Sequence, residues 1–345
     1  MIMKINGTQL YDRILAALYG GVIGDAMGAP TENKTYADID AELGWVADFD
    51  TGGTDDTILR DILVRALVDT GGYATLDDWA ARWLADYDEI FGAKQNRFFI
   101  SVLHTAFKLR EYDDPRVAAL GNVPCSSAAM GIVPVGMVNA SNPRQAAHQA
   151  YNLASLIDAH NAGVSQDGAA AMAAAMAAAL APDASVQSVL EASSAYLYPR
   201  GAAPMARAIE RSASVAAKEG SYAHYRAYVY DHAGEFFAAR KKNALETVPI
   251  TLGLLLLAEG DFGAVIPMAA NFGRDTDTMA AMAGALAGAL GGMSAAPSAW
   301  IDKARRLADA DQEALAEQLT RLAIDKRKTE ARLGEDLDKT LSANF

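Results

Sequence analysis

Residues 54–57 read Thr-Asp-Asp-Thr, and residues 275–278 read Asp-Thr-Asp-Thr. Each tetrapeptide directly precedes an apolar run that is typical of a helix, residues 58–68 in the first case and 279–290 in the second. Carboxylate and hydroxyl oxygens are the ligands that hard divalent cations prefer. If folding brings the two clusters together, they can hold a pair of metal ions, and the chain between them must then form one folding unit.

Each acidic cluster also has a simpler interpretation. Threonine and aspartate are favoured N-caps, and acidic side chains in the first turn of a helix offset its dipole. A single cluster would favour this capping role. Two features favour metal binding instead. Capping uses one or two oxygen atoms, whereas every side chain of both tetrapeptides carries at least one oxygen. In addition, Gly53 and Gly273 precede the two clusters and allow the chain to bend sharply there. An EF-hand is excluded because its glycine at loop position six and its glutamate at position twelve are missing.

The composition limits the possible functions. The chain has 345 residues, 51% of them hydrophobic, and a formal charge of −13, which argues against non-specific nucleic-acid binding. Cys125 is the only cysteine, so no internal disulfide can form, and we expect a cytoplasmic protein. The apolar run after Arg13 is a poor signal peptide because Asp12 interrupts its basic region. We also expect no membrane span, since no run reaches about 20 strongly apolar residues.

Most apolar segments repeat at helical spacing, whereas the alternation typical of strands is scarce. The segments predicted to be helical are residues 10–22, 58–67, 79–87, 98–109, 169–180, 186–196, 204–218, 222–239, 248–259, 262–270 and 279–290. We therefore predict a single compact all-α domain over residues 8–300.

Residues 301–345 differ from the rest of the chain because they are rich in charge. Leucines form two stripes there, Leu315, Leu319 and Leu322 in the first and Leu333, Leu337 and Leu341 in the second. This pattern predicts a C-terminal extension of one or two amphipathic helices. Their apolar faces either cover the protein's own core, which such stripes commonly do, or contact a second copy.

A third polar element lies upstream, in residues 20–32, which read Gly-Gly-Val-Ile-Gly-Asp-Ala-Met-Gly-Ala-Pro-Thr-Glu. It leads from the end of a predicted helix into a Gly/Pro loop that carries Asp25 and Glu32. A Walker-type phosphate loop is excluded because the Gly-Lys-Ser/Thr ending is missing.

The three elements together resemble the ADP-ribosylglycohydrolase family, which includes dinitrogenase reductase-activating glycohydrolases and the ADP-ribosylserine and ADP-ribosylarginine hydrolases. The resemblance rests on residues 24–28 followed by Glu32, on residues 54–57, and on residues 273–278 with their Ala/Gly-rich helix. The order of the motifs, their spacing and the following helices match over roughly residues 8–295. The resemblance implies an all-α orthogonal bundle with a binuclear Mg²⁺ or Mn²⁺ site.

Carried over residue by residue, the resemblance implies a set of metal ligands, with Asp277 as the bridge between the ions. These ligands are Thr54, Asp55, Asp56, Asp275, Asp277 and Thr278. Glu32 matches the family's catalytic glutamate. Asp25 matches the aspartate of the family's Gly-Asp pair, which we expect to support catalysis by holding metal-bound water.

A fourth stretch, residues 126–136, resembles the family's substrate loop, which often reads Asn-Gly-Ala-Ala-Met-Arg before a proline. Here Ser127 replaces the glycine and Gly131 replaces the arginine, so affinity for a diphosphate is in question. His160 lies where many members carry a histidine near the distal ribose, although a histidine at a helix end is more often structural. The residues expected to bind substrate are Ser126, Ser127, Ala128, Met130, His160 and Gly273.

The function that we expect from this resemblance is hydrolysis of the ribosyl C1 glycosidic bond of an ADP-ribosylated protein or an ADP-ribose derivative. It would use two Mg²⁺ or Mn²⁺ ions, with Glu32 as general base or proton relay. Two alternatives remain open: a small-molecule N-glycosidase acting on a nucleoside or ribosyl metabolite, and a non-catalytic, crystallin-like metal-binding member. A zinc hydrolase is disfavoured because the other histidines show no ligand spacing, and no serine-hydrolase elbow is present.

Overall fold

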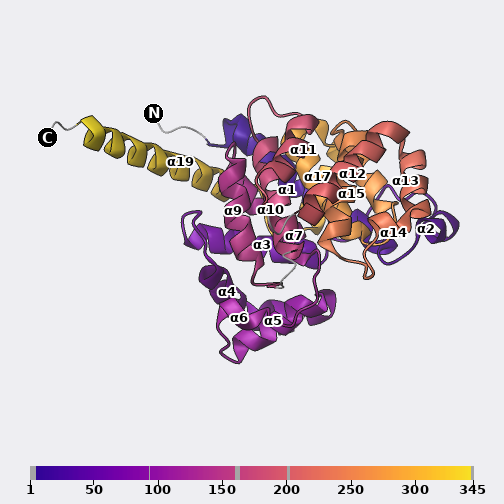
Figure 1. Cartoon of the computed structure of the whole chain (residues 1–345), viewed down its shortest axis with the longest axis horizontal. Helices are drawn as coiled ribbons and strands as arrows, with labels where there is room; N and C mark the ends of the chain where they lie inside the picture. Colours follow the sequence, from indigo (N-terminus) through magenta and orange to yellow (C-terminus); the bar gives the residue numbers. More distant parts are fainter. Residues whose placement is uncertain (1–4, 93, 160–163, 200–202, 343–345) are drawn as a thin grey trace.

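The computed structural model describes residues 5–92, 94–159, 164–199 and 203–342, and the regular structure in these ranges is entirely helical (Figure 1). The α-helices are α1 (Gln9–Gly28), α2 (Tyr36–Glu42), α3 (Asp55–Asp69), α4 (Leu76–Ala85), α5 (Ile100–Arg110), α6 (Pro115–Ala118), α7 (Ser127–Gly131), α8 (Val133–Val138), α9 (Pro143–Ala154), α10 (Val164–Ala179), α11 (Val186–Ala195), α12 (Ala203–Glu219), α13 (Tyr222–Asp231), α14 (Ala233–Phe236), α15 (Ala244–Leu257), α16 (Phe262–Ala270), α17 (Thr276–Gly291), α18 (Ser298–Leu307) and α19 (Gln312–Ser342). Shorter turns are η1 (Ile5–Gly7), η2 (Ala29–Thr31), η3 (Asp88–Gly92), η4 (Gln95–Arg97) and η5 (Met293–Ala295). The predicted all-α class is confirmed.

The centre of the fold is an antiparallel pair formed by α1 and α17. A β-carbon at Gly20 would lie 2.1 Å from the carbonyl oxygen of Gly284, and one at Gly24 would lie 2.0 Å from that of Ala280. Small residues recur every four positions on both helices, so the two backbones touch along their length. This contact sets the C-terminal end of α1 beside the N-terminal end of α17.

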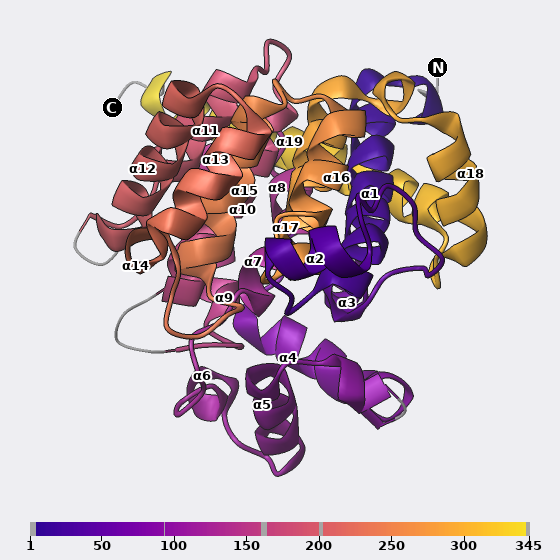
Figure 2. The same cartoon turned by 90° about the vertical axis from the view of Figure 1, so that its right-hand side faces the viewer.

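The other helices surround this pair (Figure 2). Helices α16, α18 and α19 pack on α1, while α10, α15 and α16 pack on α17. The Ala/Met-rich α10 is itself enclosed by α8, α9 and α11, and α12 covers α15. Helices α4, α5 and α6 form a smaller lobe, at the bottom of Figure 1, that contacts the body through α3 and α9.

One buried arginine ties two helix ends to α1. The Arg13 guanidinium donates hydrogen bonds to the carbonyl oxygens of Ala289 and Leu290 in α17 and to those of Ala179 and Ala181 at the end of α10. The last carbonyls of a helix have no partner within it, so a cation placed there satisfies them and stabilises the negative end of the dipole.

Two predicted helices end earlier than their apolar spacing suggests. Helix α4 stops at Ala85, before Tyr87, and the buried Asp86 carboxylate beyond it binds Arg65 and Arg82. The predicted helix over residues 222–239 divides at His232, whose backbone is not helical and whose ring stacks on Tyr228.

The C-terminal region has two different parts. The predicted boundary at residues 300–301 falls inside α18, and Ile301, Ala304, Ala316 and Leu319 join the buried core. Beyond about residue 330, α19 extends past the body of the protein as a single projecting helix (Figure 1). No helix in the described part of the chain has both the length and the apolar character needed to cross a membrane.

Candidate metal centre and active site

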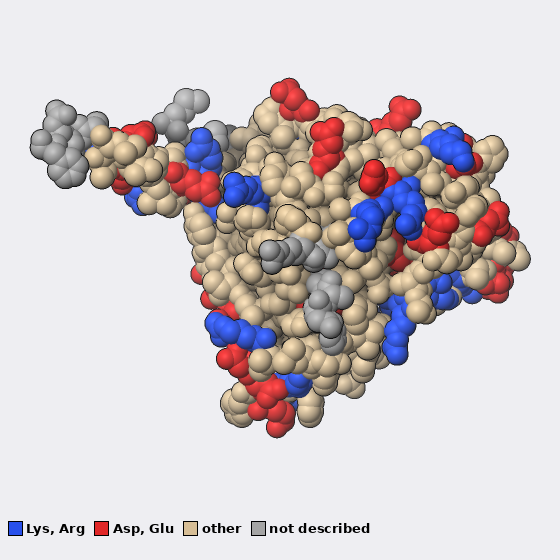
Figure 3. Space-filling view, in the orientation of Figure 1, with Lys and Arg blue, Asp and Glu red and all other residues tan. Residues whose placement is uncertain are grey.

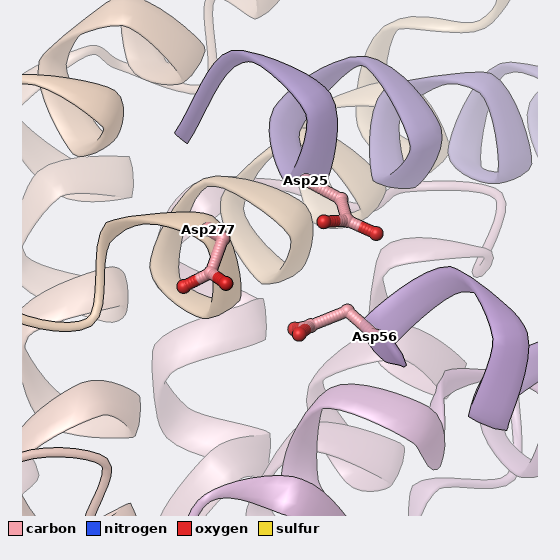
Figure 4. A group of neighbouring side chains, drawn as sticks. All are labelled: Asp25, Asp56 and Asp277. Carbon is pink, nitrogen blue, oxygen red and sulfur yellow. The ribbon is translucent and has the colours of Figure 1, made fainter. Parts of the chain in front are cut away.

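Three carboxylates from three helices converge at the end of the central pair. Asp25 lies near the C-terminal end of α1, Asp56 in the first turn of α3 and Asp277 in the first turn of α17. Each offers one oxygen, and these oxygens lie within 4.8 Å of one another. In Figure 4 the three side chains point into the same space. Folding therefore brings the two acidic clusters together, and Asp25 joins them.

A second group of carboxylates adjoins the first. Glu32, which follows η2, offers an oxygen within 4.8 Å of oxygens of Asp275 and Asp277. Asp277 belongs to both groups, because its position at the start of α17 faces the end of α1 on one side and the η2 loop on the other. Each of the two groups could hold a divalent ion, and the two groups share Asp277.

Asp25 fixes the start of α3. Its Oδ1 accepts a hydrogen bond from the Thr54 hydroxyl (2.7 Å), and its Oδ2 accepts from the Thr54 amide (2.7 Å), the Thr57 amide (3.0 Å) and the Thr57 hydroxyl (2.6 Å). The N-terminus of α3 is thus capped by a side chain of α1 rather than by its own threonine. Gly53, with φ +108°, makes this approach possible, since a β-carbon there would lie 2.7 Å from Asp25.

The loop before α17 is held by backbone bonds to the Glu32 loop. The Asn33 amide donates to the carbonyl of Arg274 (2.6 Å), and the Arg274 amide donates to the carbonyl of Lys34 (2.7 Å). Arg274, with φ +73°, pairs with the buried Glu246 of α15. These contacts lock Glu32 and the second acidic cluster into one rigid unit.

Gly273 shapes this loop and does not line the cleft described below. It has φ +92°, and a β-carbon there would lie 2.2 Å from the Tyr230 hydroxyl and 2.8 Å from the Tyr36 amide. Because Tyr230 and Tyr36 cover it, the predicted contact between Gly273 and substrate gains no support from its position.

Lys242 is the principal cation beside the carboxylates. It precedes α15 and forms an ion pair with Glu32. Its carbonyl accepts a hydrogen bond from the Ser126 amide (2.9 Å), and the Ser126 hydroxyl donates to Asp275 Oδ2 (2.8 Å). Ser126, predicted to bind substrate, therefore positions a predicted metal ligand.

The buried carboxylates raise one another's pKa values. Burial, followed by the charge of Asp277, holds the pKa of Asp56 well above its usual range, and burial with the charge of Asp275 does the same to the pKa of Asp277. Burial and Asp25 raise the pKa of Asp55 to about 7, and burial raises the pKa of Asp275 to about 6 although Lys242 opposes the shift. Burial also raises the pKa of Asp25.

The pKa of Lys242 also rises, but here the rise favours the charged form. Burial by itself lowers its pKa, but the hydrogen bond and charge of Glu32 raise the pKa further, and the charges of Asp275 and Asp277 add to this rise. The net shift is upward, so Lys242 stays cationic. Positive charge is therefore favoured at this site.

The donor set fits a hard divalent cation. All the converging ligand atoms are oxygens, and the Oδ1 atom of Asp56 is buried and has no hydrogen-bond partner among the described residues. A buried, unpaired carboxylate oxygen is costly unless a cation or proton joins it. Mg²⁺ and Mn²⁺ are the cations that such ligands suit.

The predicted substrate loop is largely buried. Helix α7 contains Ser127, Ala128 and Met130, and each is at most 5% exposed. The Met130 sulfur accepts a hydrogen bond from the Thr278 hydroxyl at 3.7 Å, so both side chains turn towards each other. The pKa of the neighbouring Cys125 is raised to about 11 by burial, which makes it a poor nucleophile. His160 lies outside the described residues.

A cleft of about 390 Å³ opens onto the carboxylates. It is lined by Ala29, Glu32, Thr51, Gly52, Gly53, Thr54, Asp55, Asn96, Arg97, Lys242, Asp277 and Asp309. Four of the predicted site residues are thus reached from solvent, namely Glu32, Thr54, Asp55 and Asp277. Asp25, Asp56, Asp275 and Thr278 are also buried and do not line the cleft.

Sequence reasoning gave no role to three residues that the structure places at the site. Thr57 belongs to the first acidic motif, but its hydrogen bond to Asp25 depends on the packing of α1 against α3. Lys242 and Arg97 lie far from every motif in the sequence. The nearest signal for Lys242 was a basic pair, Lys241 and Lys242, directly before a helix N-cap.

Known proteins resemble this chain in sequence and in fold. A protein of Escherichia coli (strain K12) named "Uncharacterized protein YegU" is 26% identical over 311 residues, which cover 82% of this chain and 89% of that protein. A solved structure described as an "ADP-ribosylglycohydrolase-related protein complex" shares the fold, with a TM-score of 0.65 and 23% identity over 91% of this chain and 99% of that one. The sequence model of the ADP-ribosylglycohydrolase family matches residues 6–329. With nearly the whole chain matched, the protein belongs to the ADP-ribosylglycohydrolase family.

Proposed function

We propose that this protein is a divalent-metal-dependent hydrolase that cleaves the ribosyl C1 glycosidic bond of an ADP-ribosylated protein or an ADP-ribose derivative. The family is one of hydrolases that act on ADP-ribose-type substrates. The observation that carries the proposal is the presence of two clusters of carboxylates beside an open cleft. Asp25 and Asp56 belong to one cluster, Glu32 and Asp275 to the other, and Asp277 to both.

In this proposal two Mg²⁺ or Mn²⁺ ions are held by Thr54, Asp55, Asp56, Asp275, Asp277 and Thr278. Asp277 would be the ligand that serves both ions, because it is the member common to both carboxylate clusters. Asp25 orients the first cluster through its hydrogen bonds to Thr54 and Thr57. When bound, the ions supply Lewis acidity to the ribose hydroxyls and to water.

Glu32 is the proposed general base or proton relay. Its side chain is 22% exposed and lines the cleft, so it reaches both solvent and a bound sugar. The ion pair with Lys242 limits the rotation of the carboxylate. From this position Glu32 would take the proton of the attacking water and pass it to the leaving group as the bond from C1 to that group breaks, and the surrounding carboxylates would stabilise positive charge that develops on the ribose ring.

Two cations line the cleft beside the carboxylates of Glu32, Asp55, Asp277 and Asp309, and they could contact the phosphates of a substrate. Arg97 and Lys242 both line the cleft, and guanidinium and ammonium groups are common partners of phosphate oxygens. Either cation could take the role of the arginine that the family's substrate loop often carries and that is Gly131 in this chain. These two cations are the reason for which we expect an ADP-ribose moiety, rather than an uncharged nucleoside, to bind there.

One observation favours the second candidate, a small-molecule N-glycosidase. The Ser126 amide donates to the Lys242 carbonyl and so does not point freely at a diphosphate, and α7 is buried. Binding of ADP-ribose, ribose 5-phosphate and ribose by calorimetry separates the two candidates. We expect ADP-ribose to bind at least tenfold more tightly than ribose 5-phosphate, whereas equal affinities would favour the N-glycosidase.

The activity test is turnover of ADP-ribosylated arginine and serine peptides, O-acetyl-ADP-ribose and simple N-ribosides, with Mg²⁺ and with Mn²⁺. We expect Glu32→Gln to lower turnover about 10²- to 10⁴-fold while metal binding persists. Asp183→Asn, which removes one exposed carboxylate far from the motifs, is the control. If the wild-type chain cleaves none of these compounds at high concentration, the hydrolase proposal is wrong and the metal-binding, non-catalytic alternative gains.

A further inference from the structure

One of the two carboxylate groups at the site already contains a cation. The two groups share Asp277; the Asp56 group adds Asp25 and Asp56, and the Glu32 group adds Glu32 and Asp275. Lys242 forms an ion pair with Glu32, and the charges of Asp275 and Asp277 also act on its ammonium. In the Asp56 group, by contrast, the buried Oδ1 atom of Asp56 has no hydrogen-bond partner among the described residues. The chain itself thus partly neutralises one group and leaves a carboxylate oxygen unpaired in the other.

The backbone places Lys242 beside Glu32. Its φ of +64° lies in the left-handed region, which a residue with a β-carbon adopts only at a cost in free energy. Its carbonyl accepts a hydrogen bond from the Ser126 amide (2.9 Å), and the next residue, Asn243, caps α15 by accepting one from the Leu245 amide (2.9 Å). Because contacts on both sides hold this turn, a fixed part of the loop presents the ammonium to Glu32.

Little water screens this ion pair. On the face seen in Figure 3, acidic and basic side chains lie interspersed at the surface, where solvent and salt weaken their attraction. The side chains of Lys242 and Glu32 are instead only 28% and 22% exposed, and both line the cleft. Charges in such a partly buried place act on one another more strongly. A metal ion that binds beside Glu32 therefore meets repulsion from the ammonium of Lys242.

We propose that Lys242 is the built-in counter-ion of the Glu32 group and opposes the binding of a metal ion there, so that the two ions of the site bind with unequal affinity. This role rests on the binuclear site of the proposed function. The ion of the Asp56 group binds first, because Asp56 has an oxygen without a partner. The second ion binds once the flexible side chain of Lys242 turns away from Glu32 into the cleft of about 390 Å³. At low metal concentration the protein holds one ion, and Lys242 stands in for the other.

Titration calorimetry with Mn²⁺, without substrate, measures the two affinities. The wild type is expected to bind one ion at least about tenfold more tightly than the other. Lys242→Met removes the charge and keeps the β-carbon, so the backbone at φ +64° is no more strained than before. This variant should bind the weaker ion at least about tenfold more tightly than the wild type does. Unchanged or weakened binding of that ion would overturn the proposal and leave Lys242 as a residue that only positions Glu32.

Two further variants separate the effect of charge from that of structure. Lys34→Met removes an equal charge from the loop that carries Glu32, but the Lys34 ammonium pairs with Glu42 (2.6 Å) and does not line the cleft. Both metal affinities should therefore stay within about twofold of the wild-type values. Lys242→Arg keeps the charge and should keep the second ion weak. Tightening of the second ion in either of these variants would contradict the proposed role of Lys242.

Thermal unfolding supplies a readout that a purely structural lysine would not move in the same way. Without metal, Lys242→Met leaves the Glu32 group without its cation, so its melting temperature should fall below that of the wild type. Saturating Mn²⁺ should then raise the melting temperature of the variant by more than it raises that of the wild type. A lysine that only holds the loop together would instead lower the melting temperature equally with and without metal, and that result would refute the proposal.

Metal binding is measured here independently of catalysis, so the two proposals can fail separately. Two ions of unequal affinity that respond to Lys242→Met as expected would support the role of Lys242 even if no ADP-ribose compound is cleaved. An active wild type whose two ions bind equally tightly would refute that role and leave the hydrolase proposal standing. Binding of a single ion by both the wild type and Lys242→Met would also refute it, whereas a second ion that appears only in the variant would support it.

Discussion

Replacement of Asp277 by asparagine separates metal binding from folding. Asparagine has nearly the same shape, but it offers one oxygen and no charge where aspartate offers two oxygens to two neighbouring groups. In the metal-free protein the substitution removes a buried carboxylate whose pKa is held high by burial and by Asp275, Glu32 and Asp25. The variant should therefore unfold at the same temperature as the metal-free wild type or above it.

Metal should then reveal the difference. At one hundred times its dissociation constant, an ion that binds only the folded state stabilises it by about 2.7 kcal/mol. The chain has 345 residues, and unfolding entropy of about 2.1 cal/mol/K per residue gives about 0.7 kcal/mol/K, so the melting temperature rises by about 4 °C. Loss of about 1.4 kcal/mol of binding free energy per ion weakens the binding of that ion about tenfold. At the same metal concentration, which is then about ten times the dissociation constant, each ion stabilises the fold by only about 1.4 kcal/mol, and the rise in melting temperature per ion falls to about 2 °C.

Differential scanning calorimetry of wild type, Asp277→Asn and the exposed control Asp183→Asn, each with chelator and with Mg²⁺ or Mn²⁺, measures these shifts. Titration calorimetry gives the stoichiometry. An undiminished metal-induced shift in Asp277→Asn would show that Asp277 is not a shared ligand. A large drop in the metal-free melting temperature would instead assign Asp277 a structural role.

Three further predictions concern stability. Arg13→Met should lower the free energy of unfolding by about 3 kcal/mol in urea titrations, because helix-end carbonyls lose their donor, and an unchanged value would contradict this. Gly24→Ala should lower the free energy of unfolding by at least ~4 kcal/mol or prevent folding, because its β-carbon would lie 2.0 Å from the carbonyl oxygen of Ala280. In the control Gly7→Ala the β-carbon meets no atom within 4 Å, so this change should be near neutral. Burial lowers the pKa of Lys326 to about 8, so folding favours its neutral form and wild-type stability should rise between about pH 8 and pH 10.5. Lys326→Met should therefore show its largest gain in melting temperature below pH 8 and a smaller one at pH 10; a gain independent of pH would refute the shift.

The class of the fold and the polar motifs could be predicted from the sequence because they depend on local chemistry. Helical spacing of apolar residues is local, and it was sufficient for α3, α10 and α17. Oxygen-bearing residues were recognisable as candidate ligands because residue type alone decides which cations they suit.

Only the tertiary structure decided which of these residues meet. Asp25 was expected to hold metal-bound water. In the structure it caps α3, and one of its oxygens also lies within 4.8 Å of oxygens of Asp56 and Asp277. Lys242 has no motif of its own, and its ion pair with Glu32 depends on how α15 packs against α17. Whether a leucine stripe covers a core depends on where the core ends, so the exposed half of α19 could not be told from its buried half by spacing alone. Sequence patterns record the preferences of single elements, whereas contacts between distant elements arise from packing of the whole chain.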